Sequence, residues 1–279
     1  MENLFDKITQ YWVKLTGRRV KPAEYEWLLG PVGDADVIED RFIRRLVDED
    51  HLEIRENEQG VGLLENMSDA LGLNSKERAL LRPEIIHFYE HTADYEFEFW
   101  SEWTGVFRPF GWLLAVLFSR RLRQLNLPLS PMDAAYGLES RIIKLVKQGK
   151  ARYTVWFRTL KANHRVIYSG VYTTCLFQGQ PFLKVVFPLP NGNATVLMAR
   201  EVQPDGSLLL ASDGKKFGEH GFYFTLTDKQ GRFWAKYVKP MHEWIRVYLD
   251  DQDRLRADHD LHFYGLRFLR LHYKMQQKS

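Results

Sequence analysis

The chain has 279 residues, which is long enough for one large domain or two ordinary ones with a sizeable hydrophobic core. Its 45% hydrophobic and 27% charged residues are typical of soluble globular proteins and exclude a largely disordered chain. The formal net charge of +3 is too small to indicate binding to nucleic acid, so no nucleic-acid partner is expected. The aromatic content of 14% is high, as in proteins with large cores or apolar pockets.

Cysteine usage and the longest apolar run bear on the cellular location. Cys175 is the one cysteine in the sequence, so an intrachain disulfide is excluded and a reducing compartment is compatible. The first residues include the acids Glu2 and Asp6 and no continuous apolar segment, which predicts that there is no signal peptide. The longest charge-free apolar run, Pro109 to Phe118, is about half of the roughly 20 residues that a membrane-spanning helix needs. We therefore expect a cytoplasmic protein that is not integral to a membrane.

The first part of the chain has the apolar spacing of helices. It predicts an amphipathic helix over residues 3–15, a short helix over 22–29, and a third helix that Asp34 or Asp36 caps and that runs to about Val47. Residues 52–62 are acidic and contain glycine, which indicates an exposed connection.

Two later helix predictions depend on local signals. Ser75 is the expected cap of one helix, with Arg78 at the position where a capping box has glutamate. Pro83 then begins a helix expected to run to about Trp100. After the prolines of residues 128–131, one more helix is expected over 133–147, with its apolar residues turned inward.

From residue 151 onward the apolar period is two, which indicates strands. Turn signals separate about ten short runs, as expected for an antiparallel barrel or a two-sheet sandwich. The predicted fold is α+β, with a helical region over 1–147 and an antiparallel β domain over 151–279, packed as one compact unit. The runs after the first, which begins at 151, cover residues 165–177, 182–188, 194–202, 207–212, 221–227, 232–239, 242–250, 253–263 and 266–275.

The segment from Phe107 to Arg123 is the most hydrophobic run of the chain. As a helix, Phe110 to Phe118 would be apolar on every side, which requires deep burial or contact with lipid. The arginines of the following segment, Arg120–Arg123, would suit anionic lipid headgroups. A core helix, a lid and a peripheral membrane contact are all compatible with this composition.

Three residues match a metal-binding string. His87, Glu90 and His91 form the H-x-x-E-H pattern and so resemble the inverzincin metallopeptidases, which implies two histidine ligands to zinc and a glutamate general base. Glu139 is the candidate third ligand. The alternative is an aromatic helix face on which both histidines bond to nearby carboxylates.

Two polar residues fall within apolar rows of the last strands. Glu243 is in register with Ile245 and Val247, and His259 is in register with Leu261. A buried carboxylate needs a partner, so Glu243 and His259 are expected to pair if both point inward. Such a pair would suit a ligand-orienting or acid/base site, whereas positions at the strand ends would leave both residues in water.

The predicted function is binding of a hydrophobic small molecule, such as a lipid, an isoprenoid or a polycyclic metabolite, in a cavity of the β half. In an enzymatic version without cofactor, Glu243 and His259 would act as base and acid of a cyclase or isomerase. The alternatives are a zinc-dependent hydrolase at the H-x-x-E-H string and an interaction module without a small-molecule site. The candidate ligand contacts are Tyr153, Trp156, Phe157, Tyr223, Trp234, Trp244, Arg246 and Phe263.

Overall fold

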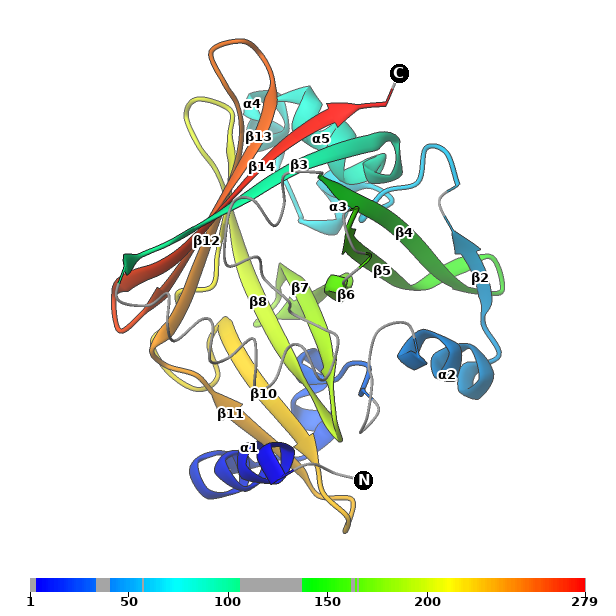
Figure 1. Cartoon of the computed structure of the whole chain (residues 1–279), viewed down its shortest axis with the longest axis vertical. Coiled ribbons are helices and arrows are strands. Elements are labelled where there is room, and N and C mark those ends of the chain that lie inside the picture. The colour runs from blue at the N-terminus through cyan, green and yellow to red at the C-terminus, as the bar shows by residue number, and fades with distance from the viewer. Residues whose placement is uncertain are drawn as a thin grey trace.

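The computed structural model describes residues 4–33, 41–56, 58–105, 137–161, 164 and 166–278. Within these ranges the fold is α+β, as predicted: helices lie before residue 95, and the strands form an antiparallel sheet closed into a ten-strand barrel with additional strands (Figure 1). The helices are α1 (Leu4–Thr16), α2 (Arg41–Asp50), α3 (Met67–Ala70), α4 (Ser75–Leu80) and α5 (Pro83–Glu90), with 3-10 turns η1 (Pro22–Glu24), η2 (Glu26–Leu28) and η3 (Thr92–Asp94).

The barrel closes because one edge of the long strand β8 pairs with two different strands. Strand β8 pairs with β7 along one edge, and its other edge pairs with β10 over residues 192–197 and with β9 over 199–202. Strand β9 in turn pairs with β12, which completes the ring β3-β4-β5-β6-β7-β8-β9-β12-β13-β14. The ring strands are β3 (Tyr95–Trp103), β4 (Leu138–Lys147), β5 (Lys150–Leu160), β6 (Val166–Phe177), β7 (Gln180–Leu189), β8 (Gly192–Val202), β9 (Leu208–Ala211), β12 (Met241–Leu249), β13 (Leu255–Phe263) and β14 (Leu266–Gln277).

A smaller unit branches from the barrel at β8, and we call it the annex. It consists of β10 (Gly221–Thr227), β11 (Phe233–Tyr237), β1 (Arg18–Arg19), α1 and the turns η1 and η2. Its own core surrounds the fully buried Tyr223 and Leu28. Gly17 allows α1 to end against β11, since a Cβ atom at this position would lie 2.8 Å from the carbonyl oxygen of Ala235.

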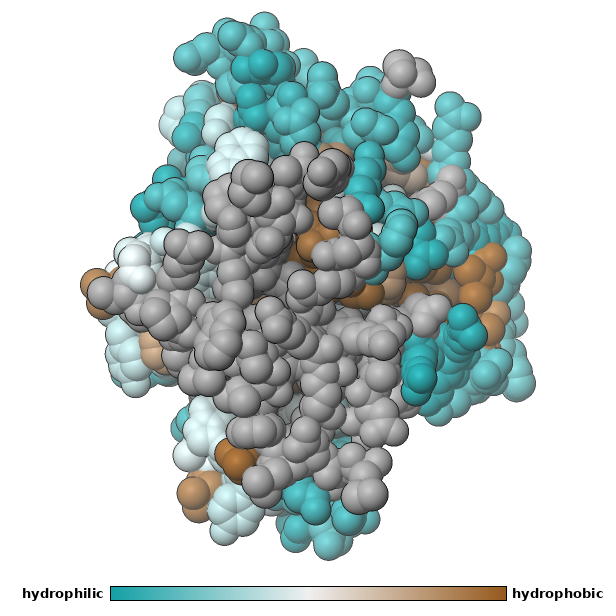
Figure 2. All heavy atoms as spheres, viewed as in Figure 1, coloured by the Kyte–Doolittle hydropathy of each residue, from teal (hydrophilic) through white to brown (hydrophobic). Residues whose placement is uncertain are grey.

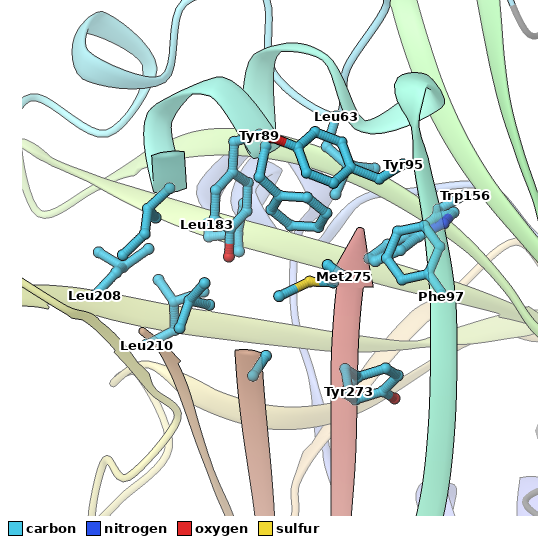
Figure 3. Packing of buried hydrophobic residues seen from close by; sticks show 14 of the residues in the cluster. Leu63, Tyr89, Tyr95, Phe97, Trp156, Leu183, Leu208, Leu210, Tyr273 and Met275 are labelled. Atoms are coloured by element: carbon cyan, nitrogen blue, oxygen red, sulfur yellow. The ribbon is translucent and has the colours of Figure 1, made fainter. Parts of the chain in front are cut away.

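Helices cover the barrel at one end and on one side. Apolar residues of the 63–73 segment and α5, together with Leu81 after α4, pack on the inward side chains of the strands in one continuous core. Figure 3 shows this packing, in which Tyr89 of α5 points toward the strands that carry Leu183, Leu210 and Met275. On the outer face, Phe42 of α2 and its neighbours pack on β4, β5, β6 and β7. Strands β4 and β5 are therefore buried on both faces.

This burial explains one incorrect prediction, the helix over 133–147. Residues 138–147 form strand β4, and residues 133–136 lie outside the described part of the chain. Ile142 faces the barrel interior while Ile143 and Leu145 face α2. A strand with apolar residues on both faces has no clear period of two, so the spacing of its apolar residues resembled that of a helix.

The helix expected over 83–100 was also wrong in its second half. Helix α5 begins at Pro83 as predicted but ends at Glu90, and strand β3 starts at Tyr95. Along β3 the burial alternates strictly, with Phe97 and Phe99 inside. Residues 53–56, expected in an exposed connection, form strand β2 (Glu53–Glu56), which pairs with β4 although all four residues are exposed.

The cap of α4 differs from the prediction by one residue. Asn74, and not Ser75, occupies the N-cap position, and its side chain accepts hydrogen bonds from the backbone N–H groups of Lys76 and Glu77. Glu77 accepts in return from the backbone N–H of Asn74, which completes a capping box.

The segment 107–123 lies outside the described residues, so the question of core, lid or membrane contact for Phe110–Phe118 and Arg120–Arg123 stays a prediction. Among the helices that the structure describes, none has the length and apolar character needed to cross a bilayer.

Candidate ligand site in the barrel interior

Glu243 and His259 lie together inside the barrel. Strands β12 and β13 pair with Ile245 opposite His259, which places Glu243 diagonally across from the histidine on the same face. His259 Nε2 lies 2.9 Å from Glu243 Oε2, with side-chain exposures of 13% and 6%. The two side chains therefore form a hydrogen-bonded pair that is almost fully shielded from water. Their roles as base and acid stay a prediction.

A second polar group faces the same interior from strands β5 and β6. The guanidinium of Arg158 lies over the indole ring of Trp156, with 3.9 Å between the guanidinium carbon and the ring centroid. Its Nη2 also donates to the hydroxyl of Tyr172 at 3.4 Å. Arg158 is only 4% exposed, so its charge is held by these contacts and by others inside the protein.

Electrostatic coupling joins the two groups. Burial raises the pKa of Tyr172; the positive charge of Arg158 opposes this rise, and the negative charge of Glu243 adds to it. Burial also raises the pKa of Tyr273 to about 12, again against the effect of Arg158. We call Arg158, Tyr172, Glu243, His259 and Tyr273 the interior polar cluster. Its tyrosines stay protonated at neutral pH and act as neutral hydrogen-bonding groups.

An open cavity of about 320 Å³ lies between the 63–70 segment and strands β4, β5 and β6, and one member of this cluster, Tyr172, lines it. Tyr172 lines the cavity and also touches Arg158, so it connects the opening with the interior. Lys144, only 7% exposed, also lines the cavity; burial lowers the pKa of its ammonium group, and the negative charge of Glu65 opposes this. The cavity is lined by Leu63, Leu64, Glu65, Asn66, Ala70, Lys144, Ala151, Arg152, Tyr153, Thr154, Tyr172, Thr173 and Thr174.

The structure separates several of the predicted ligand contacts from this interior. Tyr223 and Trp234 belong to the annex, where Tyr223 is fully buried and Trp234 Nε1 donates to Asp228 at 3.2 Å. Trp244 lies against His262, with ring centroids 4.9 Å apart. Arg246 forms an ion pair with Asp205, and Phe263 is 36% exposed at the end of β13. None of these five residues lines the cavity.

The three predicted contacts on β5 divide between its faces. Trp156 lies inside the barrel, donates to Ser140 Oγ at 2.7 Å and packs near Phe97. Phe157 packs under α2 on the opposite face, and Tyr153 packs partly against that same outer core while also lining the cavity. Of the three, Trp156 alone points into the barrel, whereas the row of Tyr153, Val155 and Phe157 packs on the outer core.

Sequence reasoning missed Arg158, Tyr172 and Tyr273. Arg158 follows Trp156 by two residues and precedes Leu160 by two, so its two neighbours on the same face of β5 are apolar and buried. The same signal had identified Glu243 and His259. It did not identify Arg158, because the other row of β5, with Tyr153, Val155 and Phe157, is the more apolar one in the sequence although it packs on the outer core.

In the H-x-x-E-H string the two histidine rings stack on each other, and the glutamate side chain accepts a backbone hydrogen bond. The rings of His87 and His91 stack with centroids 4.4 Å apart, and His87 Nδ1 is hydrogen-bonded to the Tyr95 hydroxyl at 2.9 Å. Glu90 Oε1 accepts from the backbone N–H of Met67 at 2.7 Å. Within the described ranges, no three His, Cys, Asp or Glu side chains cluster in a way that would hold a metal ion.

Comparison with known proteins finds one informative likeness. No protein-family model matches the chain, and no solved structure matches it. The chain is similar to the uncharacterized membrane protein YndJ of Bacillus subtilis (strain 168), with 27% identity over 231 residues. The match covers 81% of this chain and 40% of YndJ, so the chain spans less than half the length of this relative.

Proposed function

We propose that the barrel binds a hydrophobic small molecule that carries an acidic group. One observation carries the proposal: the open cavity is lined by Tyr172, which is hydrogen-bonded to the buried Arg158. A volume of about 320 Å³ lies near the lower end of the range for small-molecule sites, roughly 300–1,000 Å³.

The chemistry of the wall favours an amphipathic ligand. Leu63, Leu64 and Ala70 offer apolar surface on the side of the helical cap. Lys144 and Tyr172 offer a cation and a neutral hydroxyl on the side of the strands. The negative charge of Glu65 on the same wall already acts on the desolvated ammonium of Lys144, and a ligand carboxylate would add a charge-assisted hydrogen bond, which is among the strongest in proteins.

The interior polar cluster would hold the acidic group in one orientation. Arg158 places its positive charge behind Tyr172, and Glu243 with His259 lies further along the same interior. Neither Glu243 nor His259 lines the cavity, so the proposed activity is binding and not acid/base catalysis. We place this binding in the cytoplasm, in keeping with the single cysteine of the sequence.

The experiment is a fluorescence titration with cis-parinaric acid, a polyene fatty acid, and with its methyl ester. We expect saturable binding of the acid and at least about tenfold weaker binding of the ester, because a hydrogen bond to a charged group contributes roughly 1.5–3 kcal/mol. Absence of saturable binding by either probe, together with no apolar molecule found by native mass spectrometry of the purified protein, would refute the proposal.

Two lysines provide a matched pair of variants. Lys144 and Lys184 are 7% and 6% exposed, and burial lowers the pKa of both. Lys184, however, donates to the carbonyl of Leu29 on the outside of the barrel and does not line the cavity. Lys144→Met should weaken binding of the acid about tenfold, while Lys184→Met should leave it unchanged. Equal effects of the two substitutions would place the binding site elsewhere.

A further inference from the structure

Helix α1 presents its most apolar side to solvent. Ile8, Tyr11, Trp12 and Leu15 are 53%, 69%, 37% and 73% exposed. Their spacing of three and four residues places them along one side of the helix, and we call them the α1 stripe. A helix of a water-soluble fold normally turns such a side to the core, so an exposed stripe indicates a surface with a partner.

The position of the helix on the annex is nevertheless well defined. Val13, on the opposite side of α1, is 2% exposed. The edge of Trp12 meets the ring of Phe224 with centroids 5.9 Å apart, and Lys236 Nζ donates to the carbonyl of Thr16 at 3.0 Å. The helix is thus held by Val13, by the edge of Trp12 and by its C-terminal end, while Ile8, Tyr11 and Leu15 of the stripe are exposed to solvent. Figure 2 shows apolar atoms at the lower edge of the molecule, in the region where Figure 1 draws α1.

The sequence from Lys7 onward through the stripe is basic. From Lys7 to Lys21 the sequence contains five basic residues and no acidic one. Lys7 and Lys14 are seven residues apart, so they lie two helical turns apart along one border of the stripe. Arg18 and Arg19 follow directly after the helix. The stripe is therefore an apolar strip bordered by cations.

We propose that the α1 stripe binds the surface of an anionic lipid bilayer, with the helix lying in the plane of the interface. The aliphatic side chains enter the acyl boundary, the tyrosine and tryptophan suit the headgroup level, and the bordering cations meet anionic headgroups. The cytoplasmic leaflet of cell membranes carries such a negative surface charge. A second copy of the chain suits the stripe less well, because a two-fold contact would bring the same cations together. This inference is independent of ligand binding in the barrel.

The experiment is sedimentation of the full chain with vesicles of phosphatidylcholine and phosphatidylglycerol at 7:3, compared with vesicles of phosphatidylcholine alone. We expect binding to the mixed vesicles, about tenfold weaker binding to the neutral ones, and a similar loss for Lys7→Gln with Lys14→Gln. The double variant Ile8→Ser with Leu15→Ser should lose at least about tenfold in binding to the mixed vesicles.

A matched control comes from the opposite end of the molecule in Figure 1. Leu80 of α4 is 45% exposed, close to the 53% of Ile8, so Leu80→Ser removes a similar exposed side chain and should leave vesicle binding unchanged. Absence of wild-type binding to the mixed vesicles would overturn the proposal. So would equal losses for Ile8→Ser and Leu80→Ser, or a dimer in light scattering that the stripe substitutions dissociate while no vesicles are bound.

Discussion

Arg158 rests its guanidinium on the face of Trp156 inside the barrel, 3.9 Å from the ring centroid. The two residues are two positions apart on β5, so their side chains leave the strand on the same face. The indole N–H is directed to Ser140, which fixes the ring as a platform beneath the charge. Trp156 thus holds the Arg158 cation in the core, and strand β5 itself contains no carboxylate.

Replacement of Arg158 by lysine should destabilise the protein by at least about 1 kcal/mol. A desolvated cation–π contact contributes up to roughly 2 kcal/mol, and a lysine ammonium cannot stack or reach Tyr172 with the same planar geometry. Urea unfolding of Arg158→Lys, Trp156→Phe and the double variant measures this. The losses should be less than additive, and strict additivity would contradict an energetic contact between the two side chains.

The pair of Glu243 and His259 should contribute strongly to stability. His259→Leu leaves a 6% exposed carboxylate without its ring partner, which should cost about 3 kcal/mol in the free energy of unfolding. The additional substitution Glu243→Leu should restore part of this loss, because the unpaired carboxylate is then absent. Urea unfolding of both single variants and the double variant measures the coupling, and a loss below about 0.5 kcal/mol for His259→Leu would show that water reaches the carboxylate.

Neighbouring residues at the start of α4 should differ in their effect on stability. Asn74→Ala removes the side chain that accepts from two backbone N–H groups, so we expect a loss of about 1 kcal/mol. Ser75→Ala lies inside the helix and should change the free energy of unfolding by less than about 0.5 kcal/mol. Thermal unfolding of the two variants compares them directly, and a larger loss for Ser75→Ala would contradict the observed cap.

Asp205 should contribute to the loss of stability in acid. The side-chain hydroxyl and backbone N–H of Ser207, followed by Arg246, lower the pKa of this carboxyl from 3.8 to about 2. Because its pKa is lower in the folded protein, Asp205 stabilises the fold above pH 3.8, and this stabilisation is lost as the pH falls toward 2. The side chain is 51% exposed, so the contribution should stay under about 1 kcal/mol.

Urea unfolding between pH 2 and pH 5 measures this effect. Asp205→Asn should reduce the slope of stability against pH in that window, whereas Asp251→Asn, at an exposed turn position, serves as a control for the loss of one carboxylate. Identical pH profiles for the two variants would contradict the assignment to Asp205.

The strand half of the fold was predictable because its turns are specified locally. Asn191 before Gly192 and Gly206 after Asp205 adopt positive φ angles, which asparagine and glycine tolerate best, and each lies in a turn between two predicted runs. Burial on one face then gives strands such as β12 and β13 a readable period of two. The same period revealed Glu243 and His259 as inward polar residues.

The remainder depends on contacts between distant parts of the chain. Strand β4 was missed because α2 covers the face that would otherwise have been polar. Strand β1 has two residues and is a strand because it pairs with β11, which lies more than 200 positions later in the sequence. The inward side of β5 is fixed by the barrel, and not by its own pattern, so Arg158 could not be assigned to the interior from the sequence.

The ring order has a kinetic consequence. Strand β14 lies between β13 and β3, and its pairing with β3 joins Leu269 to Trp103 and Gln277 to Tyr95. The barrel therefore cannot close during synthesis until β14 has left the ribosome, and the earlier strands must wait with open edges. Pairings across such sequence separations slow folding, so we expect refolding from urea in the range of milliseconds to seconds or slower.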